Sequence, residues 1–242
     1  MVTDVHTAFD RIPFFRILSE EDRRRLAAYA EIRTLPHGHH LWQDGQPTNE
    51  FVFVVRGRMK LVQSHEKGKQ TILEIGEAGD LLCASAVCTY SPYCCSSMCM
   101  EDGTEVLVVP RRDILELVER NQDVAKAFVR EIACRGMAMC QRVEELASGR
   151  VEQRIAILLL KLADRAGVAH NAQQVRIPIP LSRQDIADLC ATTVETSIRV
   201  MSRFRRLGIV DGAARGLLVK DRAALQSIAR GDPVPKLEAR SA

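Results

Sequence analysis

Residues 182–199 read SRQDIADLCATTVETSIR, a pattern typical of two short helices joined by a tight turn. Ser182 can cap the first helix, because its hydroxyl can accept a hydrogen bond from a free N–H of the first turn. Thr192 or Thr193 can cap the second helix in the same way. The stretch therefore predicts a helix-turn-helix motif, with helices over Arg183–Leu189 and Val194–Leu207.

The second helix places two charged residues on one side. Glu195 and Arg199 are four positions apart and so share a helix face. Arginine can pair with O6 and N7 of guanine, and glutamate can accept from N4 of cytosine, which suits the reading of base edges in DNA. A solvated ion pair, with Glu195 closing a capping box with Thr192, would explain the same spacing. The residues expected to contact DNA are Ser182, Arg183, Thr193, Val194, Glu195, Ser197, Ile198, Arg199, Arg203 and Arg205.

The charge distribution supports a nucleic-acid partner. Residues 150–242 contain 16 Lys and Arg against 9 Asp and Glu, whereas residues 1–149 contain 18 against 22. A basic part joined to an acidic part favours a phosphate-bearing partner bound by the C-terminal part. Arg203 and Arg205 continue the second helix and suit phosphates, which supply affinity without sequence information.

The elements around this motif complete a winged domain. Hydrophobic periodicity and turn residues predict further elements after the motif and before it. They are a helix over Val151–Ala166, a strand over Arg176–Ile179, a β-hairpin over Ile209–Val219 and a helix over Asp221–Arg230.

The N-terminal half has the pattern of short strands. Apolar runs separated by glycines over residues 32–110 predict a compact antiparallel β-roll. A helix capped by Ser19 precedes it and runs to about Glu31, and helices over Arg111–Arg120 and Asp123–Ala147 follow it. The fold class is therefore α+β, with a hinge at Ser148-Gly149. The expected domains are a β-roll sensor domain with flanking helices (1–120), a long helix (121–148), a winged helix-turn-helix (149–231) and a tail (232–242).

The long helix carries a narrow apolar seam. Its apolar and small residues are spaced alternately three and four apart, which is the heptad pattern of a helix that packs against its own copy. A stripe this narrow is too small for a fully buried helix. We therefore expect a homodimer, with an interface formed by Val129, Ile132, Gly136, Met139, Val143 and Leu146.

Five of the eight cysteines fall between positions 83 and 99. In a reducing compartment, such a cluster argues for metal binding or redox chemistry. Thiolates suit an iron–sulfur cluster, zinc or copper, and metal-free thiols can also sense oxidants. Small thiols that pack a barrel interior would be the structural alternative. The candidates are Cys83, Cys88, Cys94, Cys95 and Cys99, and Cys83, Cys88, Cys95 and Cys99 are the preferred ligands of an iron–sulfur cluster.

Residues 9–230 resemble the CRP/FNR family of bacterial transcription regulators. The resemblance rests on the phrases Val55-Arg56-Gly57-Arg58-Met59, Gly79-Asp80-Leu81 and Val194-Glu195-Thr196 with Arg199-Val200. It implies a cupin-like β-roll of the cyclic-nucleotide-binding type, a dimerisation helix and a winged helix-turn-helix. It also implies a homodimer on a near-palindromic operator and contact with RNA polymerase. Val194 is similar to the oxygen-responsive branch, which implies TTGA-like half-sites, although Ile198 replaces a serine of that branch.

The resemblance also locates the sensor pocket. Cyclic-nucleotide binders carry a Glu where this chain has Ala84, and an Arg-Ser pair where it has Cys94-Cys95. Since a buried phosphate needs a charged partner, we do not expect cyclic-nucleotide binding. Cys140 falls where family members touch the nucleotide base, and it is a further candidate metal or redox residue.

Two cofactor assignments of the family do not carry over directly. The oxygen-sensing branch has its cluster cysteines near the N-terminus, and this chain has none before Cys83. Carbon-monoxide sensors bind haem through a cysteine at a position like Cys83, but their companion histidine is Ser85 here. Haem therefore remains an alternative to an iron–sulfur cluster, zinc, copper or no cofactor.

These patterns favour one function and leave others open. We expect a cytoplasmic, sequence-specific DNA-binding regulator whose DNA affinity is switched by the cysteine-rich pocket. No membrane partner is expected, because the sequence has no apolar run of about 18 residues and no signal peptide. The alternatives are a metal-free thiol sensor, a haem- or small-molecule-responsive regulator, and an architectural DNA-binding protein without an effector. An enzyme is not expected, because the roll contains no His/Glu metal triad and no nucleophile with a base.

Overall fold

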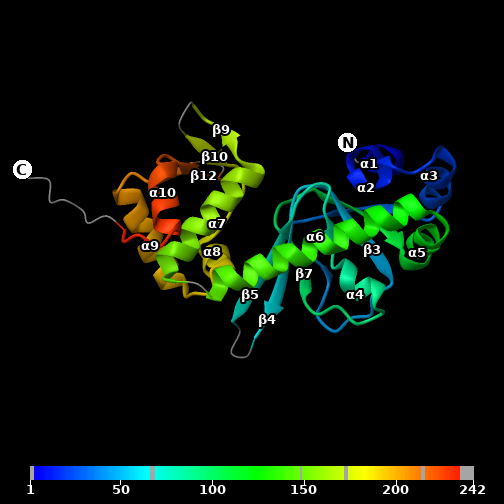
Figure 1. Ribbon diagram of the computed structural model, residues 1–242, viewed down its shortest axis with the longest axis horizontal. Helices are drawn as coiled ribbons and strands as arrows, with labels where there is room; N and C mark the ends of the chain where they lie inside the picture. The colour runs from blue at the N-terminus through cyan, green and yellow to red at the C-terminus, as the bar shows by residue number, and fades with distance from the viewer. Residues whose placement is uncertain (1–2, 66–68, 148, 172–173, 214–215, 235–242) are drawn as a thin grey trace, which may run out of the picture. The chain divides into compact units, whose positions relative to one another are not determined.

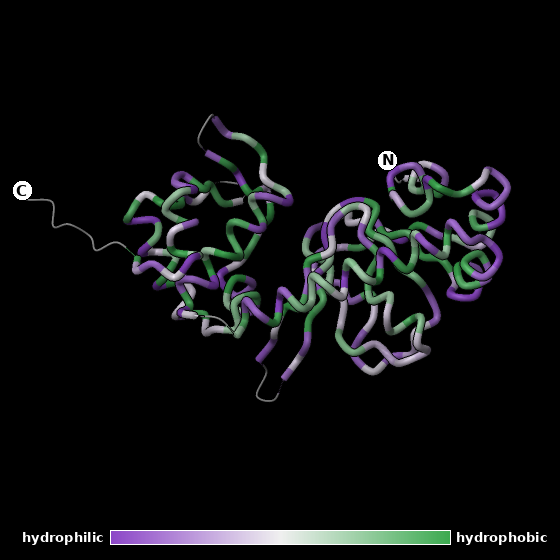
Figure 2. Tube along the Cα trace, in the orientation of Figure 1, coloured by the Kyte–Doolittle hydropathy of each residue, from purple (hydrophilic) through white to green (hydrophobic). Residues whose placement is uncertain are grey.

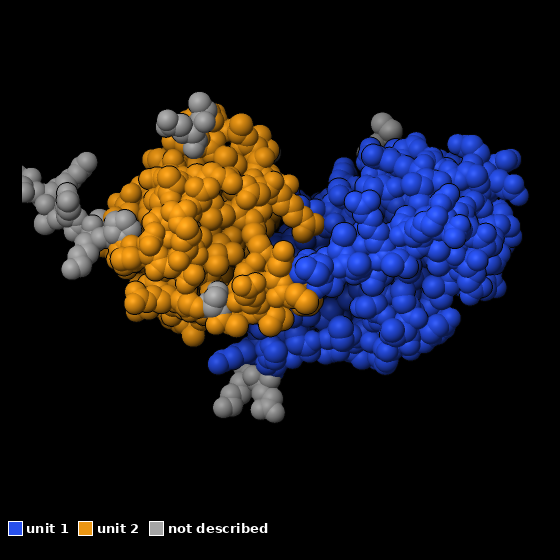
Figure 3. Space-filling view, in the orientation of Figure 1, with its two compact units in different colours: residues 1–138 blue, residues 139–242 orange. Residues whose placement is uncertain are grey.

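The computed structural model describes residues 3–65, 69–147, 149–171, 174–213 and 216–234. Its helices and strands are labelled in Figure 1. The chain divides into two compact units, residues 1–138 and 139–242 (Figure 3), and the boundary falls within the long helix α6 (Gln122–Ala147). Ser148 of the expected hinge and residues 235–242 of the expected tail lie outside the described residues.

Two four-stranded antiparallel sheets form the β-roll within the described part of the first unit, as the sequence predicted. One sheet has the order β1-β8-β3-β6 and the other the order β2-β7-β4-β5. The strands are β1 (Glu31–Leu35), β2 (His40–Trp42), β3 (Glu50–Arg56), β4 (Met59–Ser64), β5 (Gln70–Gly76), β6 (Leu81–Leu82), β7 (Ser96–Cys99) and β8 (Thr104–Pro110).

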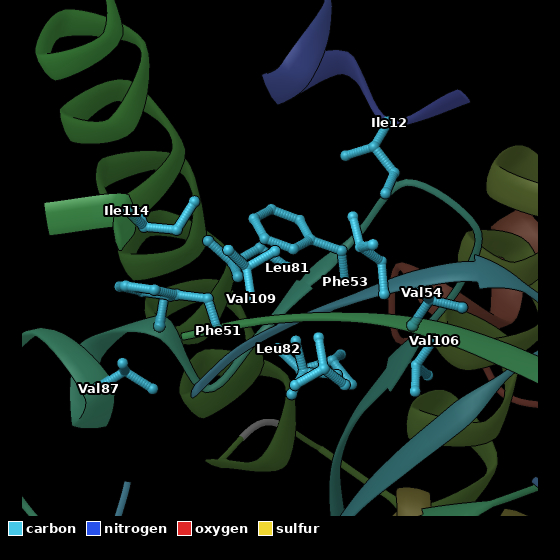
Figure 4. Close-up of a cluster of buried hydrophobic side chains, with 14 of the residues drawn as sticks. Ile12, Phe51, Phe53, Val54, Leu81, Leu82, Val87, Val106, Val109 and Ile114 are labelled. Carbon is cyan, nitrogen blue, oxygen red and sulfur yellow. The ribbon is translucent and has the colours of Figure 1, made fainter. Parts of the chain in front are cut away.

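The core of the first unit lies on both sides of strand β3. Its five residues from Phe51 to Val55 are all buried. Both faces of the strand are covered, which explains why its sequence does not alternate between apolar and polar residues. Phe53 packs on Phe15, with ring centroids 4.7 Å apart, and Phe51 packs on Phe128 of α6 at 5.6 Å. Figure 4 shows Phe51, Phe53 and their neighbours in this cluster. The start of α6 is thereby fixed against the roll.

Helices flank the roll at both ends of the first unit. They are α1 (Val5–Arg11), α2 (Pro13–Arg16), α3 (Glu20–Ala27), α4 (Ala84–Cys88) and α5 (Arg111–Arg120). Ser19 caps α3 as expected, but the helix ends at Ala27 and Glu31 begins β1, so the expected end at Glu31 is wrong. The sequence pattern did not indicate α1, α2 or α4. These helices are short, and four to seven residues leave little room for a helical period.

The second unit is a winged helix domain. A sheet of order β11-β12-β10-β9 packs with four helices besides the end of α6 in the described residues. The elements are α7 (Val151–Ala166), β9 (Val168–Ala169), β10 (Val175–Ile177), α8 (Arg183–Leu189), α9 (Val194–Arg206), β11 (Val210–Ala213), β12 (Gly216–Val219) and α10 (Arg222–Ala229). Strands β11 and β12 form the expected antiparallel wing, and residues 214–215 between them lie outside the described residues.

Apolar residues are concentrated inside each unit, as Figure 2 shows by hydropathy. In the second unit the side chains of Leu159, Ile186, Phe204 and Leu225, which come from four different helices, are all buried. Among the described residues, no helix combines the length and the apolar character that crossing a membrane requires.

Candidate functional site

The helix-turn-helix is built by local hydrogen bonds that its sequence specifies. The Ser182 hydroxyl accepts from the Asp185 N–H at 3.0 Å, and the Asp185 carboxylate accepts from the Ser182 N–H at 2.9 Å. This capping box starts α8. Ala191 turns the chain with φ of 45°, and the Thr193 hydroxyl accepts from the Thr196 N–H at 3.2 Å to start α9. Of the two expected caps for α9, Thr193 is therefore the one used.

Two arginines from outside the motif hold its turn. The Arg142 guanidinium, from the end of α6, donates to the Leu189 carbonyl, and Arg154 of α7 donates to the Cys190 carbonyl at 2.9 Å. These carbonyls lie at the end of α8, where carbonyl groups find no hydrogen-bond donor within the helix. The orientation of α8 and α9 is thus tied to α6 and α7. The sequence pattern contains no signal for these contacts, since both arginines lie far from the motif in the chain.

Helix α9 presents a polar face opposite its buried one. Val200, Met201 and Phe204 are buried, whereas Glu195 and Arg199 are exposed on the other side, as predicted. Hydrogen bonds from its own backbone N–H and from the Thr193 hydroxyl lower the pKa of the Glu195 carboxyl, which is therefore an ionised acceptor. Ile198 is 45% exposed beside this pair and offers an apolar surface.

One of the predicted DNA contacts is contradicted by the structure. Ser197 is fully buried, so it cannot reach DNA. Its position follows from the helical period, which groups Ser197 with Val200, Met201 and Phe204 on the inner face. Arg203 stays a predicted contact, and it is half-buried and donates to the carbonyl of Val234 at 2.9 Å.

A groove beside α9 collects positive charge. It has a volume of about 510 Å³ and is lined by Ser182 and Arg183 of the α8 start, Arg205 of α9 and Gly212 of the wing, among others. Burial, followed by the neighbouring charge of Arg205, lowers the pKa of the Arg183 guanidinium. Two like charges that face one groove can be neutralised by a phosphate. Val194 is half-buried, while Ser182 and Thr193 are exposed.

The predicted dimer seam is exposed over most of its length. Val129, Met139 and Val143 are 66%, 45% and 60% exposed in the single chain, and Gly136 is also exposed. Ile132 and Leu146 are half-buried. Large apolar side chains left open along one helix favour a partner surface.

In the β-roll, two of the clustered cysteines meet. The Sγ atoms of Cys83 and Cys95 are 3.5 Å apart. Cys95 is buried, Cys83 is half-buried and Cys94 is exposed. Cys83 lies between β6 and α4 with the left-handed φ of 46°, a conformation that costs a non-glycine residue about 1 kcal/mol or more.

Hydrogen bonding and burial shift the pKa values of these thiols in different directions. A hydrogen bond from the Cys83 thiol, with a second from the Cys94 thiol, lowers the pKa of Cys95 against the opposing effect of burial. The same bond to Cys95, together with burial, raises the pKa of Cys83. Burial is the main cause that raises the pKa of Cys94. Cys95 is therefore the sulfur best placed to exist as the reactive thiolate.

The other candidate cysteines lie elsewhere. Cys99 is buried in β7, and its thiol donates to the Glu101 carbonyl at 3.0 Å. In an extended chain four residues span roughly 13 Å, so Cys95 and Cys99 cannot both reach one metal ion at about 2.3 Å. Cys88 is half-buried at the end of α4, and Cys140 is exposed on α6.

The preferred ligand set is therefore corrected. The structure does not bring Cys83, Cys88, Cys95 and Cys99 together as a four-thiolate site. Among the described residues, no group of three or more His, Cys, Asp or Glu side chains is placed to hold a metal ion. What the structure does assemble is a sulfur pair.

Aromatic residues that the sequence pattern did not single out surround this pair. The indole N–H of Trp42 donates to the Cys95 carbonyl at 3.0 Å, and Trp42 stacks on Tyr93 with ring centroids 4.3 Å apart. Trp42 lies 53 positions before Cys95 and belongs to another strand, so no local spacing could reveal the contact.

Comparisons with known proteins agree with this division of the chain. Residues 153–228 match the model of the Crp-like helix-turn-helix domain, and residues 32–121 match that of the cyclic nucleotide-binding domain. The chain is 26% identical to the "Cyclic AMP receptor protein" of Thermus thermophilus over 90% of this chain and 97% of that one. It is also 26% identical to the "Transcriptional activator protein anr" of Pseudomonas aeruginosa, over 82% of this chain and 80% of that one. The solved structure of FixK2 from Bradyrhizobium japonicum shares the fold, with a TM-score of 0.73 and 21% identity over 86% of this chain and 99% of that one.

Proposed function

Since the chain belongs to the CRP/FNR family of DNA-binding transcription regulators, which carry an effector-binding domain and are not enzymes, we propose that it is a homodimeric, sequence-specific regulator. Its second unit reads a near-palindromic operator with α9, and its first unit senses through cysteine thiols. It acts in the reducing cytoplasm, where free thiols persist.

The observation that carries the DNA-reading proposal is the exposed face of α9. Arg199 pairs with O6 and N7 of a guanine, and the ionised Glu195 accepts from N4 of a cytosine. Arg183 and Arg205 bind the adjacent phosphate across the groove that they line. The half-sites are TTGA-like, as the Val194-Glu195 phrase of the family resemblance implies.

A second copy of this chain covers the seam of α6. The exposed Val129, Met139 and Val143 then become buried, and Gly136 lets the two helices approach closely. Two recognition helices related by a two-fold axis read half-sites about 34 Å apart, which is one turn of DNA. RNA polymerase is the further partner of a regulator that binds at promoters.

The effector-binding domain senses thiol chemistry rather than a cyclic nucleotide. Ala84 is buried and has no group that could accept from a ribose hydroxyl, and Cys94-Cys95 supplies no cation for a phosphate. The sulfur contact between Cys83 and Cys95 supports a metal-free dithiol sensor. An iron–sulfur cluster, zinc, copper or haem is the competing proposal, and each requires further ligands to move toward this pair.

The proposal is tested with reduced, full-length protein and two DNA duplexes. One duplex carries TTGA half-sites as an inverted repeat with one-turn spacing, and the other carries the same bases scrambled. We expect fluorescence anisotropy at constant salt to show tighter binding of the repeat, and sedimentation to show a dimer. A monomer that binds both duplexes equally would contradict the proposal. Equal affinity before and after oxidant would indicate an architectural DNA-binding protein.

A further inference from the structure

The pair of sulfurs lies at a junction of the two sheets of the β-roll. Cys83 follows β6, which belongs to the sheet of β3, and Cys95 precedes β7, which belongs to the sheet of β4. Their Sγ atoms are 3.5 Å apart, whereas a disulfide needs about 2.05 Å. A small movement of the two segments is therefore sufficient to form a bond that joins one sheet to the other.

We propose that Cys83 and Cys95 form a reversible intrachain disulfide when a hydroperoxide reaches the sensor domain, and that this bond sets the position of helix α6. The inference deepens the proposed function and rests on it, since it names the chemistry of the thiol sensor. Cys94 belongs to the same site as a hydrogen-bond donor to Cys95, and Cys88 and Cys99 do not take part.

The chemistry uses one hydroperoxide for each pair. The Cys95 thiolate attacks one oxygen of the peroxide, the O–O bond breaks, and hydroxide or alkoxide leaves, so that Cys95 becomes a sulfenic acid. The Cys83 sulfur then attacks the Cys95 sulfur and forms the S–S bond. The sulfenic hydroxyl takes the Cys83 proton and leaves as water. The two sulfurs together lose two electrons, and these electrons reduce the peroxide. An external thiol reverses the bond by exchange.

Burial fits this order of events. Cys95 is buried, and hydrogen bonds from its two neighbours favour its thiolate, so it suits an oxidant as small as a peroxide. Cys83 is kept protonated until the second step. A sulfur with a partner at 3.5 Å is trapped as a disulfide before further oxidation to the irreversible acids.

A charged side chain links the pair to the long helix. The negative charge of Glu74 in β5 contributes to raising the pKa of Cys83, and it opposes the lowering of the pKa of Cys95. A negative charge on either sulfur therefore acts on the Glu74 carboxylate in return. The same carboxylate accepts from Arg135 of α6 at 2.8 Å, and Arg135 also pairs with Glu131 at 2.8 Å. The Arg135 side chain is 20% exposed, and its partners Glu74 and Glu131 are 31% and 39% exposed.

Oxidation ends the electrostatic interaction between the Cys95 thiolate and Glu74. The thiolate of Cys95 becomes a neutral disulfide, and the two sheets are drawn together at Cys83. Both changes shift the Glu74 carboxylate relative to Arg135, which precedes Gly136 of the dimer seam. The chemistry of the sulfurs thus acts on the helix through which two copies associate.

The test treats the reduced, full-length dimer with one equivalent of hydrogen peroxide. We expect mass spectrometry of a non-reducing digest to find a peptide that joins Cys83 to Cys95. We also expect the fluorescence of Trp42 to change, because it is the only tryptophan of the chain and donates to the Cys95 carbonyl. Operator affinity should change by about fivefold or more and return when a thiol reductant is added.

Variants separate this chemistry from general damage. C83S and C95S should lose the cross-link, the Trp42 response and the change in affinity, whereas C88S, which alters a half-buried thiol of the same region, should keep all three. C95A serves as a second variant at Cys95, and thermal melting confirms that each variant is folded.

The outcomes distinguish this inference from the proposed function. A cross-link between other cysteines, no cross-link, or a cross-link without a change in affinity would overturn the inference, even if the reduced dimer binds its operator. An iron-dependent visible band in anaerobically purified protein that is lost in C83S and C95S would also overturn it. Failure of the reduced protein to bind the inverted repeat would count against the proposed function, while the cross-link and Trp42 measurements would still decide whether the disulfide forms.

Discussion

The recognition helix α9 and the sulfur pair place their reactive groups in different ways. Glu195 and Arg199 come from one helix, whose cap at Thr193 and whose buried face fix their direction. Cys83 follows a strand of one sheet and Cys95 precedes a strand of the other, so they meet only when the whole roll is folded. The comparison teaches that single contacts can be removed from α9 without affecting the rest of its unit. Changes near the sulfurs act on the geometry of the entire first unit.

The largest expected effect is a loss of stability in the unit that carries α9. Phe204 is fully buried on the inner face of α9, and F204A should lower the free energy of unfolding by about 3–5 kcal/mol through lost burial and a cavity. Denaturant unfolding followed by circular dichroism measures the loss. S202A, on the exposed side of the same helix, should change stability by no more than about 0.5 kcal/mol. Equal effects of the two variants would show that the inner face is wrongly assigned.

A charge introduced into the α6 seam tests whether two copies of the chain associate there. Val143 is 60% exposed in the single chain, and V143D would bury two carboxylates against each other at the two-fold axis. We expect a loss of about 3 kcal/mol or more in dimer stability, since unpaired buried charges are costly. Sedimentation equilibrium should find monomers, and operator binding should weaken with it. E144D, at a neighbouring exposed position, is the control, and a V143D dimer as tight as the natural one would place the interface elsewhere.

A base contact and a phosphate contact should differ in specificity. R199A should weaken operator binding by about 1–3 kcal/mol and relax the preference at one base pair. R205A should instead weaken binding to all sequences and lower the slope of the salt dependence by about 1. Anisotropy titrations against operator and random duplexes at several salt concentrations measure both. The same loss for R199A on random DNA would contradict base reading.

The smallest expected effect tests whether Glu74 connects the Cys83–Cys95 pair to α6. E74Q removes the negative charge that pairs with Arg135 and that raises the pKa of Cys83 together with larger causes. The Cys83–Cys95 cross-link should still form, while the oxidation-dependent change in operator affinity should shrink by about 0.5–2 kcal/mol. E77Q, whose residue pairs with Arg58 instead, should leave that change intact. An unaltered response in E74Q would mean that Glu74 does not carry the signal.

The helix-turn-helix could be predicted from sequence because its determinants are local. Ser182 and Asp185 cap α8 across three positions, and α8 begins and ends at the predicted Arg183 and Leu189. The assignment of Ser197 to the DNA contacts was wrong, and the same local pattern was sufficient to avoid it. Its spacing from Val200 and Phe204 places it on the buried face, and helical period alone was enough to exclude it from the DNA contacts.

The thiol site could be predicted only in part, because its geometry is set by distant segments. Alternation along an extended segment groups Cys95 with Cys99 and separates both from Cys94, and in the structure Cys95 and Cys99 are buried whereas Cys94 is exposed. Period two gives the face but not the distance along it, so Cys99 was wrongly grouped with Cys95. The contact of Trp42 with Cys95 depends on the pairing of β2 with β7, two strands that are far apart in the chain, and no spacing in the sequence encodes that pairing.

The most direct test of the account is a selection of DNA from a random-sequence pool by the reduced full-length dimer, repeated with R199A. We predict that the reduced protein enriches an inverted repeat whose half-sites lie about one helical turn apart, and that R199A loses the preference at one position in each half-site. A selection that enriches no sequence, or one that R199A repeats unchanged, would contradict the claim that α9 reads an operator as part of a homodimer.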